Sequence, residues 1–346
     1  MRRDRQFPRD PWEDNRDRHR RALAPRNSAP REVYRARLTE AFLLNEIDVL
    51  FRSSGSYTNA RPKELGLAIV DESHRLNEKS GLFHHLGENQ IKELINSAKT
   101  SVFFIDANQR VTFKDIGTVE EIEKWAEYFN ANVVSLSLPS QFRCSGSDGY
   151  LSWIDSTLEI RETANPRLDG TYDFRVFDNP EEMRKEIFRL NQNGRTARML
   201  AGYCWKWISR RDPFAFDIKF PEFGFRMRWN DFELGQSWIM HDEGAEQVGC
   251  IHTCQGLEVD YVGVIIGDDL RFEDGLVSYP LEHPAGDLNF KGLRGRLRDS
   301  KTREQTLEMA HELIVNTYRT LLTRGMRGCF VYCSDSNLAD HLRSRL

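Results

Sequence analysis

The chain has 346 residues, of which 39% are hydrophobic and 29% charged, proportions that are ordinary for a folded globular protein. Its net charge of −4 excludes a globally basic nucleic-acid binder, so any contact with nucleic acid must come from a local patch. No apolar run reaches the roughly 18 residues that a membrane-spanning helix needs, so we expect no membrane association and a cytoplasmic location.

The composition of the first 20 residues differs from that of the rest. They hold seven Arg and five acidic side chains and few large apolar ones, which predicts a disordered charged tail. Beyond the tail, apolar segments typical of strands alternate with segments of helical periodicity. The expected strands are residues 22–24, 67–71, 101–106, 133–138, 173–177, 199–202, 259–267 and 329–333.

Such alternation is typical of parallel sheets, and it occurs twice along the chain. We therefore predict an α/β fold with two parallel-sheet domains, residues 21–139 and residues 140–346. Residues 25–30 are expected to form a polar turn before a helix at 31–44. Thr118 with Glu121 predicts a helix start, as does Asn179 before Pro180.

The segment 67–70 is apolar and ends in two adjacent carboxylates, Asp71 and Glu72. This pattern predicts a buried parallel strand that delivers both acids to the carboxyl edge of a sheet, where ligands bind. There Asp71 would hold a hydrated Mg²⁺, and Glu72 would orient or deprotonate a water that attacks a γ-phosphate. Two acids after a strand are also a common helix start, so the pair alone does not decide.

Further polar side chains follow other predicted strands. Gln109 lies three residues past the acid that ends strand 101–106, where it could sense a γ-phosphate, and Arg143 could reach a phosphate. Gly256 permits close backbone approach, and Glu258 could accept from a ribose hydroxyl. Arg324 could neutralise transition-state charge. Each also has an ordinary structural interpretation, as a loop amide or as a solvated or ion-paired residue.

Two segments could touch nucleic acid. Residues 291–303 carry six basic side chains, among them Arg294, Arg296 and Arg298, against the single acid Asp299. A solvated loop is an equally good interpretation of this segment. Residues 203–238 are dense in aromatic side chains that could stack on bases, although we favour packing between elements.

The cysteines allow two interpretations. Six are present, and Cys250 with Cys254, like Cys329 with Cys333, are separated by three residues, so a site of four thiolates for a metal is conceivable. We favour packing as small hydrophobic residues, because Cys329 and Cys333 lie in an apolar segment typical of a buried strand.

Four segments, residues 70–77, 104–110, 141–144 and 248–258, together resemble the helicase motifs of the Schlafen group 3-like DNA/RNA helicase family, P-loop NTPases similar to superfamily 1 helicases. The resemblance implies two RecA-like domains with ATP and Mg²⁺ between them, and a nucleic-acid-dependent ATPase. Because the basic segment 291–303 is local and the net charge is negative, we expect the nucleic acid to be single-stranded. It places Asp71 at the Mg²⁺ position, Glu72 at the general base and Gln109 at the coupling glutamine. The remaining implied positions are Arg143 and Arg324 for second-domain arginines, Gly256 and Glu258 for a nucleotide-contacting turn, and Asn27 and Ser28 for nucleic acid.

The chain departs from the family pattern in one respect. Family members carry a phosphate-binding P-loop with a Gly-Lys dipeptide, and this sequence contains no Gly-Lys. We therefore expect an ATP hydrolase or helicase module that is inactive or impaired as written, with a first domain truncated at its N-terminus. A partner or an upstream segment would supply the P-loop and its strand, without which the strands before Asp71 and Asp106 would lose a pairing neighbour. The alternative is a catalytically silent nucleic-acid- or partner-binding remnant.

Overall fold

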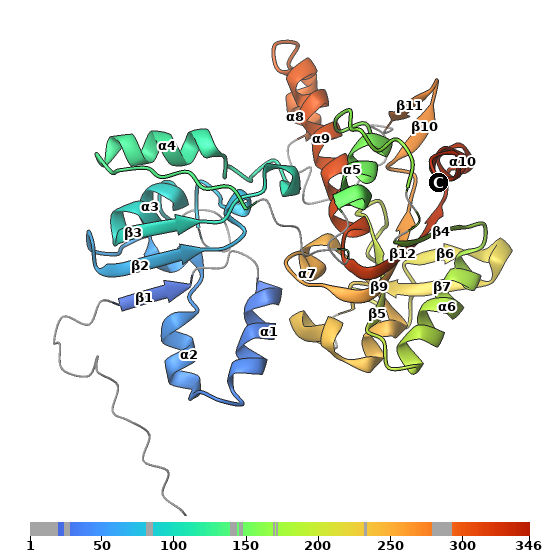
Figure 1. Cartoon of the computed structure of the whole chain (residues 1–346), viewed down its shortest axis with the longest axis horizontal. Helices are drawn as coiled ribbons and strands as arrows, with labels where there is room; N and C mark the ends of the chain where they lie inside the picture. Colours follow the sequence, from blue (N-terminus) through green and yellow to red (C-terminus); the bar gives the residue numbers. More distant parts are fainter. Residues whose placement is uncertain are drawn as a thin grey trace, which may run out of the picture.

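The computed structural model describes residues 20–23, 28–80, 86–138, 144, 148–168, 170, 172–231, 234–278 and 293–346. The predicted tail lies outside these residues except for Arg20. The described elements form two α/β halves that lie side by side, one around a three-stranded sheet and one around a seven-stranded sheet (Figure 1). A mixed α/β fold with mostly parallel sheets is thereby confirmed.

The first half is built on three parallel strands, in the order β1 (Arg20–Leu23), β2 (Leu65–Val70) and β3 (Ala98–Phe103). Helices α3 (Gln90–Ser97) and α4 (Val119–Tyr128) lie on one side of this sheet, and α2 (Leu44–Leu50) lies near β1 (Figure 1). As predicted, α4 begins at Thr118, whose side chain accepts from the backbone N–H of Glu121 at 3.1 Å. Buried Val70, Ile91 and Leu94 form part of the core between β2 and α3.

Three expectations for this half are wrong. The strand before Asp71, β2, is not short of a neighbour, because it pairs with β1 on one side and β3 on the other, whereas β3, before Asp106, pairs with β2 alone among the described strands. Residues 133–138 form no strand, since no described strand lies beside them to share hydrogen bonds, and Leu136 is 85% exposed. Residues 28–30 are not a turn but the start of helix α1 (Ser28–Leu38), where Pro30 is tolerated because first-turn N–H groups need no partner within the helix.

The second half contains the larger sheet, in the order β4-β12-β9-β5-β8-β7-β6. All neighbouring strands in it are parallel except β6 and β7. Its strands are β4 (Asp173–Phe177), β5 (Ala197–Ala201), β6 (Ile218–Phe220), β7 (Phe225–Trp229), β8 (Gln247–Gly249), β9 (Val259–Ile266) and β12 (Gly325–Cys333). The four strands that the sequence predicts here are β4, β5, β9 and β12, which are therefore confirmed.

A hairpin and six helices complete the second half. The hairpin is β10 (Arg271–Glu273) with β11 (Leu276–Ser278). The helices are α5 (Asp148–Thr157), α6 (Pro180–Gln192), α7 (Ile251–Cys254), α8 (Leu293–Arg298), α9 (Arg303–Leu322) and α10 (Ser336–Ser344). As expected, α6 starts with Pro180 after Asn179, whose side chain accepts from the N–H of Glu181 at 2.8 Å.

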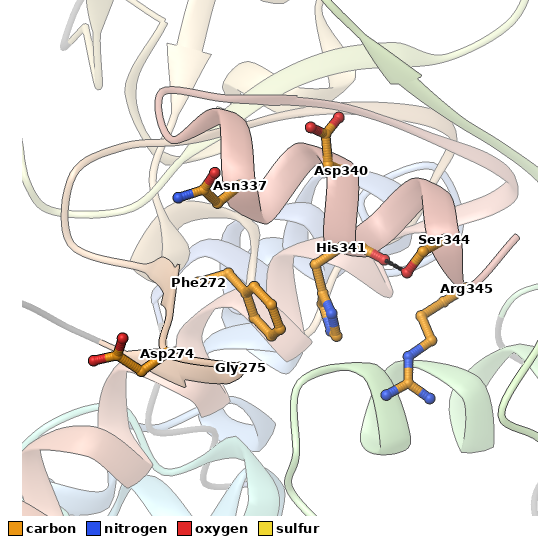
Figure 2. A pocket seen from close by; sticks show the side chains of 8 residues that line it. All are labelled: Phe272, Asp274, Gly275, Asn337, Asp340, His341, Ser344 and Arg345. Atoms are coloured by element: carbon orange, nitrogen blue, oxygen red, sulfur yellow. Dashed lines mark hydrogen bonds between the residues drawn. The ribbon is translucent and has the colours of Figure 1, made fainter.

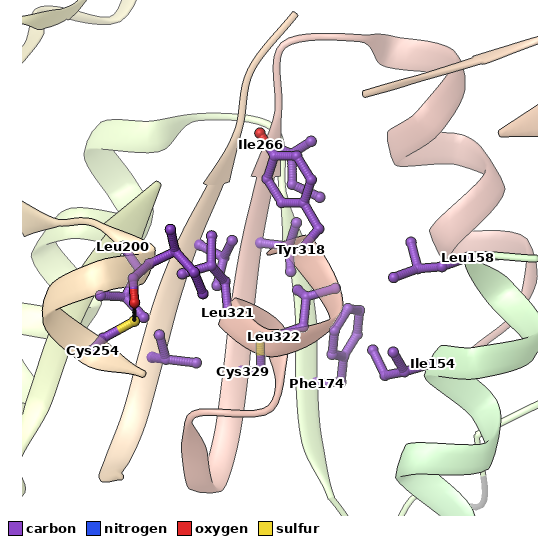
Figure 3. Close-up of a cluster of buried hydrophobic side chains, with 14 of the residues drawn as sticks. Ile154, Leu158, Phe174, Leu200, Cys254, Ile266, Tyr318, Leu321, Leu322 and Cys329 are labelled. Carbon is purple, nitrogen blue, oxygen red and sulfur yellow. Dashed lines mark hydrogen bonds between the residues drawn. The ribbon is translucent and has the colours of Figure 1, made fainter. Parts of the chain in front are cut away.

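The core of the second half forms where α9 lies on the sheet. Tyr318, Leu321 and Leu322 of α9 pack with side chains of the strands on one side and of α5 on the other (Figure 3). Cys254 and Cys329 are part of this core, and burial raises the pKa of Cys254 to about 12. The described residues contain no cluster of His, Cys, Asp or Glu that could hold a metal ion. The burial of Cys254 and Cys329 agrees with cysteines that pack as small hydrophobic residues.

Helix α1 belongs to the first half in sequence but packs on the second. Its Val33 is buried in the same cluster as Trp238 and Cys254. The helix therefore connects the two halves at the edge where β2 and β3 end. The predicted division at Pro139 falls outside the described residues, so the domain boundaries stay a prediction.

Candidate functional site

The two carboxylates lie where the sequence predicts them, directly after β2. The turn that follows is fixed by Ser73, whose hydroxyl donates to Val70 O and whose N–H donates to Phe104 O, both at 2.9 Å. Glu72 adopts the left-handed conformation, with φ of 53°, and is only 7% exposed. A non-glycine residue in this conformation costs on the order of 1 kcal/mol or more, and such residues cluster at functional sites.

A histidine that the sequence analysis did not single out lies beside Glu72. His74 Nε2 lies 2.9 Å from Glu72 Oε2, and the ring is 2% exposed. The backbone N–H of Asp106 donates to His74 Nδ1 at 3.4 Å. The imidazole therefore links the end of β2 to the segment that follows β3.

Gln109 lies beside this pair, in the short helix η3 (Ala107–Gln109) after β3. Its side chain is 2% exposed, and its Nε2 donates to Asp106 Oδ2 at 2.7 Å. Among the described residues, no hydrogen-bond partner exists for its Oε1, although that atom is buried. A buried amide oxygen without a partner carries a free-energy cost that a water or ligand would remove.

The second half reaches these residues through the segment after α7. The side chain of Gln255 is 1% exposed and lies against three groups of the first half. Its Nε2 donates to Gln109 O at 3.1 Å and lies 3.1 Å from His74 Nε2, and its Oε1 accepts from Arg75. Arg75 also lies 3.2 Å from His252 Nδ1 and 3.1 Å from Asp115 Oδ2.

Gly256 lies directly against Glu72 and helix α1. Its φ is +81°, and a Cβ added there would lie 2.7 Å from Pro30 Cγ and 3.4 Å from Glu72 Oε1. Any other residue would therefore be strained and would crowd Pro30 of the helix, with Glu72 Oε1 at van der Waals distance. The predicted close approach of backbone at Gly256 is thus present in the structure, with Glu72 as one of the neighbours.

Tyr34 of α1 shows that the acids of the two halves share one region. Its pKa is raised, first by burial and then by the negative charges of Asp71, Glu72 and Glu258. Glu258 is exposed, whereas Glu72 is buried. The structure therefore brings together four of the predicted site residues: Asp71, Glu72, Gly256 and Glu258. Tyr34 has no sequence signal beyond its position in a predicted helix.

Arg324 lies just beyond α9, in the segment that leads into β12. It is 1% exposed, and its guanidinium donates to Thr320 O at 2.9 Å and to Leu257 O at 3.4 Å. Arg319, in the last turn of α9, does reach the first half: it lies 4.0 Å from Asp106 Oδ2 and donates to buried Asp155 at 2.6 Å.

Several predicted residues can be placed only in part. Arg143 and Asn27 lie outside the described residues, and Ser28 is described only as the first residue of α1. In α8, the guanidinium of Arg296 lies 5.4 Å from the ring centre of Phe113 in the first half. Arg296 and Arg298 are exposed, and the side chain of Arg294 lies outside the description.

The aromatic segment, residues 203–238, is mostly packed. Phe220, Phe225 and Trp229 are buried in one cluster, whereas Phe214 is 91% exposed. This agrees with the interpretation that most of these rings pack between elements.

A surface hollow of about 580 Å³ lies apart from the candidate site. Side chains of the β10–β11 hairpin and α10 line it, among them Phe272, Asp340 and His341 (Figure 2). None of the predicted site residues is part of its lining. The candidate site is therefore defined by the carboxylates and their cross-half neighbours, not by this hollow.

The residues at the end of β2 fit Mg²⁺ and a nucleotide in part. Mg²⁺ is usually held by one or two carboxylates together with water and phosphate oxygens, so Asp71 is a sufficient protein ligand when a nucleotide supplies the rest. Buried Glu72 and the unsatisfied oxygen of Gln109 suit a water beside that nucleotide. The groups of a P-loop are not among the 346 residues.

The chain belongs to the Schlafen group 3 DNA/RNA helicase domain family, whose sequence profile matches residues 7–335. The resemblance seen in the motifs is thereby confirmed, and the protein is a helicase-like module. It is also similar to an uncharacterized protein of Saccharomyces cerevisiae, 24% identical over 343 residues that cover 88% of this chain and 71% of the yeast protein. No helix in the described part of the chain is long and apolar enough to cross a bilayer.

His74, Arg75 and Gln255 are the site residues that sequence reasoning missed. All three lie inside the helicase-like motifs, adjacent to residues that were singled out. Their burial and their contacts across the halves depend on tertiary structure, and only their position within the motifs could have pointed to them.

Proposed function

We propose that this protein is a nucleic-acid-dependent ATPase module of the helicase type, with two RecA-like domains and Mg²⁺–ATP between them. The observation that carries the proposal is the proximity of Glu72, at the end of β2, to Gly256 of the second half, where an added Cβ would lie 3.4 Å from Glu72 Oε1. A catalytic carboxylate that faces a glycine turn across two α/β halves suits a nucleotide bound between them. The domain limits 21–139 and 140–346 and a cytoplasmic location are part of the same proposal.

In this proposal each residue at the site has one task. Mg²⁺ would neutralise phosphate charge, with Asp71 as its protein ligand. Glu72 would accept a proton from the attacking water, and Gln109 would orient that water through its buried Oε1. Gly256 would let the backbone approach the nucleotide, and Glu258 would accept from the ribose. Arg143 and Arg324 remain proposed second-domain arginines, the latter after a change from its buried position.

The alternative proposal is a silent nucleic-acid- or partner-binding remnant, and ATP affinity separates the two. Because the P-loop groups are absent from these residues, we expect the chain alone to bind Mg²⁺–ATP with a Kd of about 1 mM, roughly −4 kcal/mol. Calorimetric titration of the whole chain measures it. Asp71→Asn should weaken binding only when Mg²⁺ is present, and Glu123→Gln, an exposed acid on α4, should change nothing. If the chain shows no saturable binding of Mg²⁺–ATP, and Asp71→Asn gives the same titration as the wild-type protein, the silent remnant is favoured.

For nucleic acid we propose salt-sensitive, sequence-independent binding of single strands through α8 and its flanks. Reversal of Arg294, Arg296 and Arg298 to Glu should reduce the slope of log K against log salt by about three, because each phosphate contact contributes about 0.9. Fluorescence anisotropy with a labelled oligonucleotide across a salt series measures this slope.

The matched control makes the same change of net charge at three exposed basic residues of the second half that lie in the sequence region of α6, β5 and β6, outside α8. These are Lys185, Arg195 and Lys219, each changed to Glu. The control should lower affinity slightly through overall charge and leave the slope nearly unchanged. An equal loss of slope in both triple variants would exclude α8 as the binding segment.

A further inference from the structure

The sheet of the first half has an open edge at β3, its last described strand on the side of α4 (Figure 1). Among the described strands, only β2 pairs with β3. The N–H of Phe104 donates to Val70 O at 2.9 Å, so the backbone groups of the even-numbered residues in this segment point toward β2. Those of Lys99, Ser101 and Phe103 therefore point the other way, to an edge that no described strand occupies.

The side chains of β3 are typical of a covered strand, yet two of the largest in and just after it are exposed. Val102 is 39% exposed and Phe104 is 44% exposed. Edge strands of natural proteins usually carry charged residues or proline that discourage further pairing, and Lys99 is the single charged residue of β3. An open strand edge with exposed apolar side chains suits the addition of another strand.

The segment 133–138 lacks a neighbour in the same way. Its apolar residues Val134, Leu136 and Leu138 alternate with serines, as in a strand, and are 79%, 85% and 77% exposed. In the view of Figure 1 this extended segment returns from the end of α4 on the side of β3. One added strand between β3 and residues 133–138 would give each of them the neighbour that it lacks among the described strands.

We propose that a β-strand of a second polypeptide inserts between β3 and residues 133–138, parallel to the three strands of the first half. The charges at the two ends of β3 select its sequence. Lys99 is exposed at the amino end, whereas Asp71 and Asp106 lie just past the carboxyl ends of β2 and β3. The strand that fits therefore starts with an acid, continues with about five mainly apolar, β-branched residues, and is followed by a lysine.

The insertion would place new groups at the candidate site. Parallel strands end at the same edge of a sheet, so the residues that follow the inserted strand would lie beside Asp71 and Asp106. A phosphate-binding loop on the second polypeptide would reach a nucleotide at that position, and this chain has no Gly-Lys of its own. This consequence rests on the proposed function, whereas the insertion itself does not.

A peptide tests the insertion in the absence of nucleotide. The probe is fluorescein-labelled Glu-Thr-Val-Ile-Val-Val-Gly-Lys, and its fluorescence anisotropy is titrated with the whole chain. We expect saturable binding, together with slower amide hydrogen exchange in residues 98–104 and in residues 132–138. A peptide with its terminal Glu and Lys exchanged should bind about 3-fold more weakly, because like charges then meet at both ends.

Two variants alter the two sides of the insertion. Ser101→Pro removes an N–H that points to the open edge and keeps the pairing with β2, so peptide affinity should fall by about 10-fold or more. Leu136→Ser, at an exposed position that does not threaten folding, should lower affinity by about 3-fold or more. The matched control is Val49→Ser on α2, which removes a side chain that is 53% exposed and should leave affinity unchanged.

Absence of saturable binding would overturn the proposal, as would full affinity in folded Ser101→Pro and Leu136→Ser or an equal loss in Val49→Ser. Slower exchange in residues 98–104 alone would overturn the placement between the two segments. A chain that binds the peptide but fails to bind or hydrolyse ATP would overturn the proposed function and leave the insertion standing, because the titration contains no nucleotide.

Discussion

Glu72→Gln is expected to lower ATP turnover by about 10²–10⁴-fold, the usual contribution of a general base, in any preparation with nucleic-acid-stimulated hydrolysis. The substitution removes only the capacity to take a proton. A glutamine has the same shape, so it can lie beside His74 and Gly256 as the carboxylate does. ATP affinity should therefore change by no more than about 2-fold, since each further factor of ten would need about 1.4 kcal/mol.

Steady-state phosphate release and equilibrium binding together test this prediction. Glu123→Gln makes the same chemical change on the exposed side of α4 and should keep wild-type values for both. Full turnover in Glu72→Gln would remove Glu72 from the role of general base. Loss of binding together with turnover would instead assign Glu72 to holding the nucleotide or its metal.

The local sequence was sufficient to predict the fold class and the position of the acids. The segment before Asp71 has the burial that a strand between two neighbours requires, and β2 is indeed central among β1, β2 and β3. Helix starts at Thr118 and Asn179 were also predictable, because capping depends on residues only a few positions apart. The predicted strand at residues 133–138 was wrong. A strand-like pattern forms a strand only beside a neighbouring strand, and the local sequence does not show whether one is present.

Contacts between the halves were not predictable in the same way. Gln255 meets His74 and Gln109 across 181 and 146 residues of sequence, so nothing near either end specifies the pairing. The arginine at the end of α9 shows the same limit. Arg319 lies in α9 and Arg324 two residues past its end, and the sequence cannot tell which of the two faces the first half, whereas the structure places Arg319 near Asp106 and buries Arg324.

The turn that carries Glu72 and His74 should depend on Gly117, where backbone packs on backbone. A Cβ at Gly117 would lie 1.9 Å from Ser73 O and 2.7 Å from His74 Cα. Neither atom can rotate away as the end of a side chain can, so Gly117→Ala must displace the turn or the segment before α4. Overpacking of this kind costs about 3 kcal/mol, and it should lower the denaturant midpoint and alter the His74 ring shifts.

Gly295→Ala is the matched control, because a Cβ there meets no atom within 4 Å and the residue lies in helix α8. An alanine in a helix is favoured over glycine by about 1 kcal/mol, so this variant should be as stable as the wild-type protein or slightly more stable. A wild-type midpoint for Gly117→Ala would mean that the segment before α4 does not press on residues 73–75. The left-handed conformation of Glu72 would then lack the packing that holds it, because a strained residue persists only where its surroundings enforce it.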